Sequence, residues 1–94
     1  MCYLSHSYAD GASLYFTVLY PLDRQRAVKQ WAEIKREATE SVLSHGGTLS
    51  HHHGVGIDHR DWMARERGSL AIEALRAVKH AVDPRGLMNP GKLL

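Results

Sequence analysis

Three consecutive histidines, His51 to His53, stand in the stretch GGTLSHHHGVGIDH, which runs from residue 46 to residue 59. Imidazole side chains exchange hydrogen bonds, carry protons near neutral pH, stabilise oxyanions and bind metals. Gly54 and Gly56 follow the run, and glycine permits backbone conformations and close approaches that a side chain would block. These residue types predict a loop that carries either polar catalysis or a metal ion.

A metal site is the less favoured of the two interpretations. In an extended backbone, the first and third histidines point to one side and the second to the other, which leaves a His-x-His pair. Zinc needs three or four nitrogen, sulfur or oxygen ligands. Cys2 is distant in sequence, and the chain has neither an H-E-x-x-H nor a C-x-x-C motif, so only His6 or His59 could complete the set. We therefore expect no metal site.

Two further interpretations concern the same run of histidines. The remnant of a purification tag is excluded, because the run lies in the middle of the chain, after two glycines and before a patterned loop. On residue types alone, an active-site loop and three exposed histidines without a function stay equally open.

Composition narrows the class of protein. The 94 residues suit one domain with a modest core, and the net charge of +2 gives neither a nucleic-acid footprint nor a polybasic membrane patch. The single cysteine, Cys2, excludes an internal disulfide and fits a reducing compartment. Because no signal-peptide pattern, S-K-L ending or apolar run of ~20 residues occurs, we expect a cytoplasmic location without a transmembrane segment.

The elements that must position the histidines begin with a predicted hairpin. Residues 14–20, LYFTVLY, are rich in aromatic and β-branched side chains and predict a strand, while residues 2–8 predict a weaker one. The ADGA stretch between them contains an Asp-Gly turn signal. Alternation places Leu14, Phe16, Val18 and Tyr20 on one face, and Tyr15, Thr17 and Leu19 on the other.

A long helix is predicted next. Pro21 ends the strand, and Asp23 can cap a helix that runs to about residue 45. Gly46 and Gly47 predict its left-handed end. Apolar side chains recur along one stripe at steps of three and four residues: Val28, Trp31, Ile34, Ala38 and Val42.

The remaining chain predicts an α+β fold. Residues 47–56 are expected to form a short extended segment, which makes a third strand beside the hairpin. Helices are expected over residues 58–67, ending at Gly68, and over residues 69–82, ending at Asp83-Pro84, with a turn-rich tail. The buried side of the last helix is expected to hold Ile72, Leu75, Val78 and Val82. The result is a partial antiparallel sheet with one long helix and two C-terminal helices.

Three stretches resemble one enzyme family. GGTLSHHHGVG resembles the signature near the C-terminus of the alkyldihydroxyacetonephosphate synthases, also called alkylglycerone-phosphate synthases, which are FAD-linked oxidases of the vanillyl-alcohol-oxidase type. SHSYADGASLYFTVLYP resembles the hairpin before their long helix, and VKHAVDPRGLMNPGKLL resembles the common ending of FAD-linked oxidases. The resemblance covers essentially the whole chain, with the motifs in the same order.

This resemblance implies a segment of a longer flavoenzyme. Residues 1–94 would be a single C-terminal part that belongs to the cap domain, with the hairpin, long helix and histidine loop in residues 1–57 and the last helices and tail in residues 58–94. The FAD-binding domain would be absent from the chain and would be its partner. FAD would be the cofactor of the parent enzyme, so we expect the chain alone to be inactive and not to bind FAD tightly.

The implied reaction belongs to ether-lipid synthesis. It exchanges the acyl group of acyl-dihydroxyacetone phosphate for a fatty alcohol: a proton leaves the carbon beside the ketone, the fatty acid departs, and the flavin retains the substrate until the alcohol attacks. Tyr15 stands where the family has its catalytic tyrosine. A free phenol titrates near about 10, so this role needs a neighbouring donor or positive charge, which the histidines can supply.

The resemblance also implies roles for the loop and the tail. His53 stands where related oxidases have the histidine of a Gly-Glu-His-Gly motif, and is expected to contact Tyr15, the substrate or the cofactor. His52 replaces the glutamate and would act as a donor or proton shuttle, while His51 would orient the loop. Asn89 is expected to lie against the flavin. Without the resemblance, Tyr15 reads as a packing residue and Asn89 as a turn residue.

Two alternatives stay open. The NPGK sequence of residues 89–92 is closer to the general oxidase pattern, so the parent could be an FAD-linked oxidase or dehydrogenase that acts on a small 2-hydroxy acid rather than a lipid-like substrate. The other alternative is a free-standing small α+β binding module that forms a homo-oligomer through an exposed sheet or helix surface.

Overall fold

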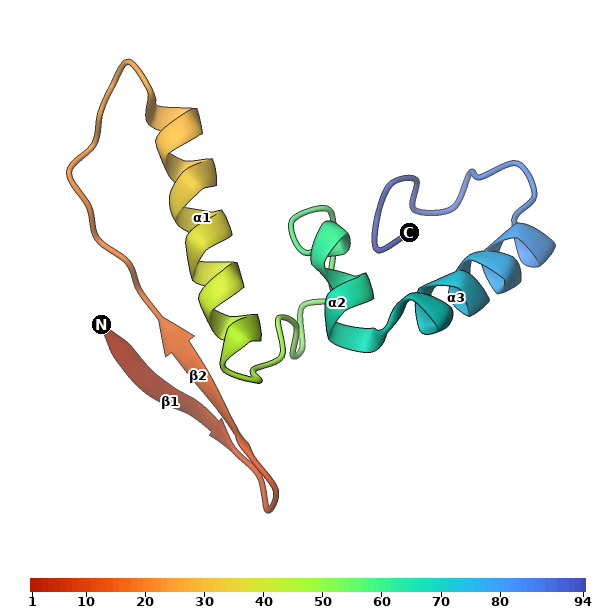
Figure 1. Ribbon diagram of the computed structural model, residues 1–94, viewed down its shortest axis with the longest axis horizontal. Coiled ribbons are helices and arrows are strands. Elements are labelled where there is room, and N and C mark those ends of the chain that lie inside the picture. The colour runs from red at the N-terminus through yellow and green to blue at the C-terminus, as the bar shows by residue number, and fades with distance from the viewer. The chain divides into compact units, whose positions relative to one another are not determined.

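The computed structural model describes residues 1–94 and has the predicted α+β architecture (Figure 1). Two compact units, residues 1–35 and residues 36–94, divide the chain within its long helix. No helix is both long enough and apolar enough to cross a membrane. The elements in chain order are β1 (Cys2–Ser7), β2 (Ala12–Phe16), α1 (Ala27–Ser44), the 3-10 turn η1 (Arg60–Trp62), α2 (Met63–Arg67) and α3 (Ser69–Val82).

The predicted hairpin is confirmed, although its second strand is shorter than expected. β1 and β2 pair antiparallel, and the backbone N–H of Tyr8 closes the turn by donating to the carbonyl of Gly11 at 2.8 Å. Thr17 and Met1 make the last ladder contacts, at 2.9 and 2.8 Å. Beyond Thr17 the chain has no strand opposite it, so residues 18–20 leave the sheet.

Helix α1 begins at Ala27, four residues after the predicted cap. The Asp23 carboxylate instead accepts the N–H of Gln25 at 3.0 Å and forms a turn before the helix. The amide of Gln30 reaches back from the first turn of α1, accepts the N–H of Asp23 at 2.9 Å and donates to the carbonyl of Pro21 at 2.9 Å. Aspartate therefore starts the turn, and a helical glutamine holds it.

The end of α1 is the glycine stop that the sequence predicts. Gly46 has φ of 75°, its N–H donates to the Leu43 carbonyl at 3.0 Å, and the N–H of Gly47 donates to the Val42 carbonyl at 2.9 Å. This pair of bonds is a Schellman motif. A Cβ on Gly47 would lie 2.8 Å from Cγ1 of Val42, so this position also needs glycine for space.

The predicted third strand is wrong, because the sheet contains only β1 and β2. Residues 51–53 form bends rather than extended backbone. The hydroxyl of Thr48 and the N–H of Leu49 donate to the carboxylate of Glu66 on α2. Two polar groups at the start of this segment are thus satisfied by a side chain instead of a strand edge.

The last two helices end at the residues that the sequence predicts. The predicted helix over residues 58–67 begins later, with η1 and then α2. Gly68, with φ of 86°, separates α2 from α3 as expected, and α3 has the predicted bounds of Ser69–Val82. Asp83 ends it, and the tail beyond is irregular.

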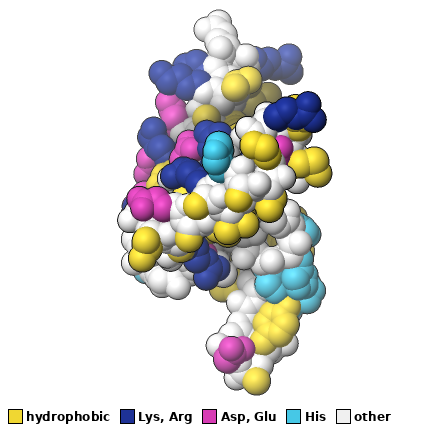
Figure 2. Space-filling view, turned by 90° about the vertical axis from the view of Figure 1, so that its right-hand side faces the viewer, with side chains coloured by type: hydrophobic (Ala, Val, Ile, Leu, Met, Phe, Trp, Pro, Cys, Tyr) yellow, Lys and Arg dark blue, Asp and Glu magenta, His cyan; other side chains and the backbone are white.

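Little of the predicted apolar surface is buried. Met63 and Ile72 form the apolar core where α2 contacts α3. The prediction is wrong for Leu75, Val78 and Val82, which are 45%, 61% and 78% exposed, because five-residue α2 is too short to cover more of α3. The stripe along α1 is likewise exposed or half-buried. Figure 2 shows hydrophobic side chains lying at the surface among charged ones.

Candidate functional site

Tyr15 is displayed on an exposed face of the hairpin. It pairs with Tyr3 across the two strands, and the rings stack with centroids 5.2 Å apart and planes 23° apart. Leu14 and Phe16 pair with other β1 residues on the opposite face, as alternation predicts. Tyr15 is 52% exposed, so its phenol is held on one side by an aromatic ring and stays accessible on the other.

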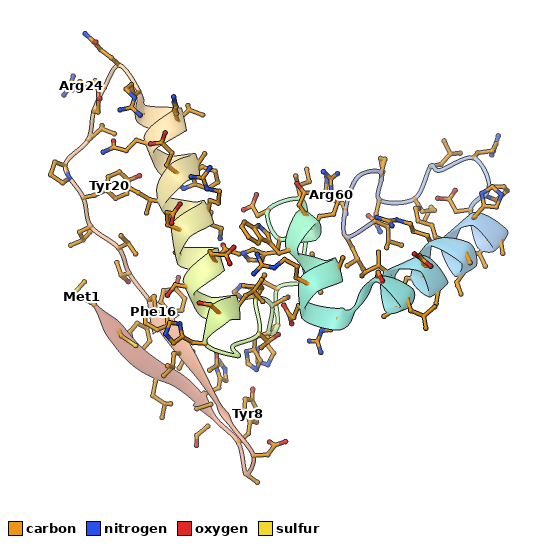
Figure 3. All side chains as sticks on the ribbon, in the orientation of Figure 1. Met1, Tyr8, Phe16, Tyr20, Arg24 and Arg60 are labelled. Carbon is orange, nitrogen blue, oxygen red and sulfur yellow. The ribbon has the colours of Figure 1, made fainter.

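A β-bulge brings a histidine onto the same face. The register shifts between Leu4 and His6, so that His6 lies opposite Ser13, two residues from Tyr15 along β2. The Ser5 hydroxyl lies 2.9 Å from His6 Nδ1. The His6 ring lies parallel to that of Tyr8, with centroids 6.4 Å apart, and Figure 3 shows Tyr8 beside the hairpin turn.

His6 is the residue of this face that pattern reasoning missed, except as one conceivable metal ligand. Strict alternation from Tyr3 places His6 on the opposite face, and the extra residue of the bulge reverses this. The strand sequence CYLSHS contains no glycine that would have signalled the change of face. The bulge itself has no residue signature, because neither Ser5 nor His6 has a positive φ.

The second candidate group is the histidine loop, which we define as residues 50–56. The rings of His51 and His52 stack with centroids 3.6 Å apart and planes 24° apart. The prediction that these two side chains point to opposite sides is wrong, because the backbone bends here instead of extending. His53 is exposed in the same loop. Gly54 and Gly56 have φ of 73° and 62°, so both glycines meet a conformational requirement.

The histidine loop is fixed at both of its ends. Before it, Glu66 accepts hydrogen bonds from the Thr48 hydroxyl and, at 3.1 Å, from the Leu49 N–H. After it, the N–H of Leu93 donates to the carbonyl of Gly56 at 2.9 Å. The tail is held further by Arg60, labelled in Figure 3, whose Nη1 donates to the Gly91 carbonyl at 3.4 Å.

An ion pair between Arg65 of α2 and Glu40 joins the end of α1 to α2. Both terminal nitrogens of Arg65 donate to the carboxylate of Glu40, each at 2.7 Å. These hydrogen bonds lower the pKa of Glu40 and raise the pKa of Arg65, and the attraction between the two charges adds to both shifts. The Arg65 guanidinium also lies over the Trp62 ring, 5.7 Å from its centroid.

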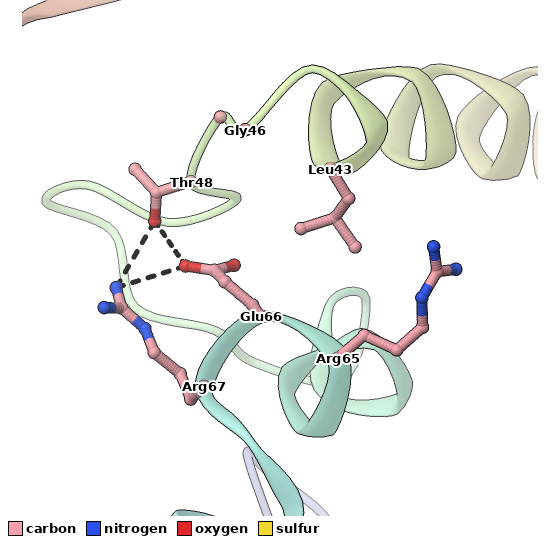
Figure 4. A pocket seen from close by; sticks show the side chains of 7 residues that line it. Leu43, Gly46, Thr48, Arg65, Glu66 and Arg67 are labelled. Atoms are coloured by element: carbon pink, nitrogen blue, oxygen red, sulfur yellow. Dashed lines mark hydrogen bonds and ion pairs between the residues drawn. The ribbon is translucent and has the colours of Figure 1, made fainter.

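A cavity of about 340 Å³ lies between the end of α1 and α2 (Figure 4). Its lining consists of Leu43, Gly46, Gly47, Thr48, Arg65, Glu66 and Arg67. Figure 4 shows Thr48 and Arg67 converging on Glu66, while Arg65 lies on the other side. Since Arg67 in this lining is paired with Glu66, and Arg65 is paired with Glu40 of α1, the cavity is better described as a junction between elements than as a ligand pocket.

Asn89 lies in a tail that is organised by Asp83. The Asp83 carboxylate accepts the N–H groups of Leu87 and Met88 at 2.9 and 3.0 Å, and accepts a hydrogen bond from Lys79 at 2.7 Å. The Lys79 hydrogen bond first, and then the two backbone donors, lower the pKa of Asp83 to about 2. Asn89 itself has φ of 46°, and its carbonyl accepts the N–H of Lys92, so it occupies a tight turn.

Comparison with known proteins finds one family. The model of "FAD linked oxidases, C-terminal domain" matches residues 1–93. Alkyldihydroxyacetonephosphate synthase from Trypanosoma brucei brucei is 40% identical over 99% of this chain and 15% of its own length. The synthase from Dictyostelium discoideum is 37% identical over 98% of the chain and 15% of its own length. D-2-hydroxyglutarate dehydrogenase from Stutzerimonas stutzeri is 36% identical over 89% of the chain and 18% of its own length. The chain thus spans less than a fifth of each.

Proposed function

Because this chain belongs to the FAD-linked oxidases, as their C-terminal domain, we propose that it supplies catalytic side chains to an alkyldihydroxyacetonephosphate-synthase-like flavoenzyme. The observation that carries the proposal is the similarity to two synthases of that name over nearly the whole chain. The dehydrogenase relative matches a smaller part of the chain.

The proposed reaction is an exchange at the carbon beside a ketone. In acyl-dihydroxyacetone phosphate, the bond from this carbon to the acyl oxygen breaks, and the fatty acid leaves as its carboxylate. The oxygen of a fatty alcohol then bonds to the same carbon, and the proton of the alcohol ends on the departed acid or in solvent. A base is also needed for the proton that this carbon loses and regains.

Tyr15 is the proposed base. Its phenol is accessible, and Tyr3 stacks against the ring, so the hydroxyl has a defined direction. His6, on the same hairpin face, is a nearby polar neighbour that the bulge supplies. Tyr15 Oη would accept the proton as a phenolate and return it after the exchange, and a donor beside it would favour the phenolate.

The histidine loop is proposed to provide that donor. His53 would contact the Tyr15 hydroxyl, the substrate or the cofactor, and His52 would act as a donor or proton shuttle. His51, whose ring stacks on that of His52, would fix the direction of its neighbour. The two fixed ends of the loop support this assignment, because side chains that act on a reacting atom need a defined position.

The residues of this chain fit a partial contact with FAD rather than a complete binding site. Its phenol and its imidazoles are exposed and can each offer donors or acceptors to a ligand, whereas the charged side chains that line the cavity beside α2 are held in ion pairs. The remainder of the site would come from an FAD-binding domain, with Asn89 of the tail beside it. Bound there, FAD supplies an electron-accepting ring system that can take up electrons from the substrate.

A small 2-hydroxy acid is the second candidate substrate, favoured by the similarity to D-2-hydroxyglutarate dehydrogenase. The two substrates differ in what happens to the flavin. Oxidation of a 2-hydroxy acid leaves the flavin reduced, whereas the exchange reaction has no net oxidation. Anaerobic mixing with D-2-hydroxyglutarate and with acyl-dihydroxyacetone phosphate, followed by flavin absorbance, therefore separates them.

The direct test of the proposed base is Tyr15→Phe in the flavoenzyme that contains this chain. We expect exchange activity to fall by roughly 10²-fold or more, the usual contribution of a general base, with unchanged flavin content. The measurement is release of fatty acid that depends on the fatty alcohol.

Tyr20→Phe is the matched control, because Tyr20 lies on the same segment but outside the sheet (Figure 3). It should retain near-normal activity. If Tyr15→Phe also retained near-normal activity, Tyr15 would be removed from the mechanism.

A further inference from the structure

The carboxylate of Glu66 is enclosed at the junction between the histidine loop and α2. Its side chain is 8% exposed, whereas that of its ion-pair partner Arg67 is mostly in solvent. One carboxylate oxygen accepts the hydroxyl of Thr48, and the other accepts the backbone N–H of Leu49 at 3.1 Å. A single side chain thus binds two successive residues of a segment that has no strand partner, and Figure 4 shows the first of these contacts, from Thr48 to Glu66.

We propose that Glu66 is the positioning residue of the histidine loop. Leu49, whose N–H it binds, stands two residues before His51. A hydrogen bond to the main chain fixes the backbone itself, so the direction in which the loop leaves Leu49 is set by the carboxylate. The contact joins residues 17 positions apart, which makes it a tertiary constraint rather than a local turn.

Arg67 offsets the cost of enclosing the negative charge of Glu66. Its Nη2 lies 3.1 Å from Oε1 of Glu66 and donates to the Thr48 hydroxyl oxygen at 3.4 Å, so Thr48, Glu66 and Arg67 form a closed triangle. An enclosed carboxylate without such partners would be costly. Arg65 does not compete for Glu66, because both of its terminal nitrogens are bound to Glu40.

The hydrogen bonds of Glu66 act together with a second contact at the other end of the histidine loop. The hydrogen bond from Leu93 to the Gly56 carbonyl fixes the loop's other end. Between these two points lie the three histidines and Gly54, whose φ of 73° lets the chain reverse. Glycine is flexible in the absence of constraints, so the order of the imidazoles depends on the anchors on each side.

The inference rests on the proposed function only where it concerns activity. The test therefore uses two readouts on the flavoenzyme that contains this chain, in variants Glu66→Ala and Glu66→Gln. The first is hydrogen exchange of the backbone amides of residues 49–56, which reports the loop without any catalysis. The second is kcat and KM for acyl-dihydroxyacetone phosphate at equal flavin content.

The control is Glu73→Gln, an exposed carboxylate on α3. We expect Glu66→Ala to speed exchange in residues 49–56 by roughly tenfold, as loss of about one net hydrogen-bond contribution implies. Its kcat should fall by roughly tenfold or more, because small displacements of catalytic groups are costly, with KM little changed. Glu66→Gln keeps an oxygen that can accept the Leu49 N–H, so it should fall between Glu66→Ala and the unaltered enzyme in both readouts.

The outcomes distinguish the positioning role of Glu66 from the catalytic role of the histidine loop. Unchanged exchange in residues 49–56 of Glu66→Ala overturns the positioning role, whatever the activity. Faster exchange with unchanged kcat supports the anchor but contradicts the catalytic use of the loop, and so counts against the proposed function. An equal fall in kcat for Glu66→Gln and Glu66→Ala, with loop exchange altered in neither, would also overturn the positioning role.

Discussion

At the scale of single residues, the residue types predicted which side chains could do chemistry. The contacts that hold those side chains in place could not be predicted. The run of histidines stood out because imidazole is rare and reactive, and the glycines after it meet a real requirement for positive φ. Glu66 could not be found in this way. It lies in an ordinary charged stretch, and its importance comes from Thr48 and Leu49, which only folding brings to it.

Asp83 is a second case, and it gives a prediction for pH. The Asp-Pro pair predicted the end of a helix, but the carboxylate also holds the tail through Leu87, Met88 and Lys79. Because its folded pKa of about 2 lies below the ordinary value of 3.8, its contribution to tail stability is present above about pH 4. That contribution is lost as the pH falls toward 2.

We therefore expect the backbone N–H signals of Leu87 and Met88 in NMR spectra to begin to shift below about pH 4 and to reach the midpoint of the shift near pH 2. Asp83→Asn should remove this titration and leave the two signals flat over the same range. A midpoint near 3.8 in the unaltered chain would mean that the carboxylate is not bound as the structure shows.

At the scale of elements, local signals predicted the ends of helices well and tertiary pairing poorly. Glycine stops and an Asp-Pro break act within a few residues, so the ends of α1, α2 and α3 could be derived from sequence. The third strand failed because an extended segment needs a partner edge, and Glu66 took the place of that partner. The β-bulge at Ser5 and the late start of α1 were likewise decided by pairing and by a side chain seven residues away.

The end of α1 gives the prediction at this scale. Gly46→Ala places a side chain at φ of 75°, so it should lower the free energy of unfolding by about 1 kcal/mol or somewhat more. Gly11→Ala is the matched control, because Gly11 has no positive φ and open space at its Cβ. Urea unfolding of both variants measures the difference. Equal stability of the two would contradict the left-handed stop.

At the scale of the whole molecule, the family is established, and the wider enzyme is the proposal. The chain carries few buried apolar side chains, chiefly Met63 and Ile72, while both faces of the hairpin and most of α3 are exposed. A chain of this size buries a small share of its surface. Under the proposed function, further parts of a flavoenzyme would cover some of this apolar surface and hold FAD beside the exposed phenol and imidazoles.

The central claim of the proposed function is that Tyr15 and His53 of the histidine loop act as one unit on the substrate. A double-mutant cycle on kcat, with Tyr15→Phe, His53→Ala and both together in the flavoenzyme that contains this chain, tests it most directly. We predict a double variant that loses much less than the product of the two single losses, corresponding to a coupling of about 1 kcal/mol or more, with flavin content unchanged. Single losses that simply multiply would show that the two groups act independently and would contradict the claim.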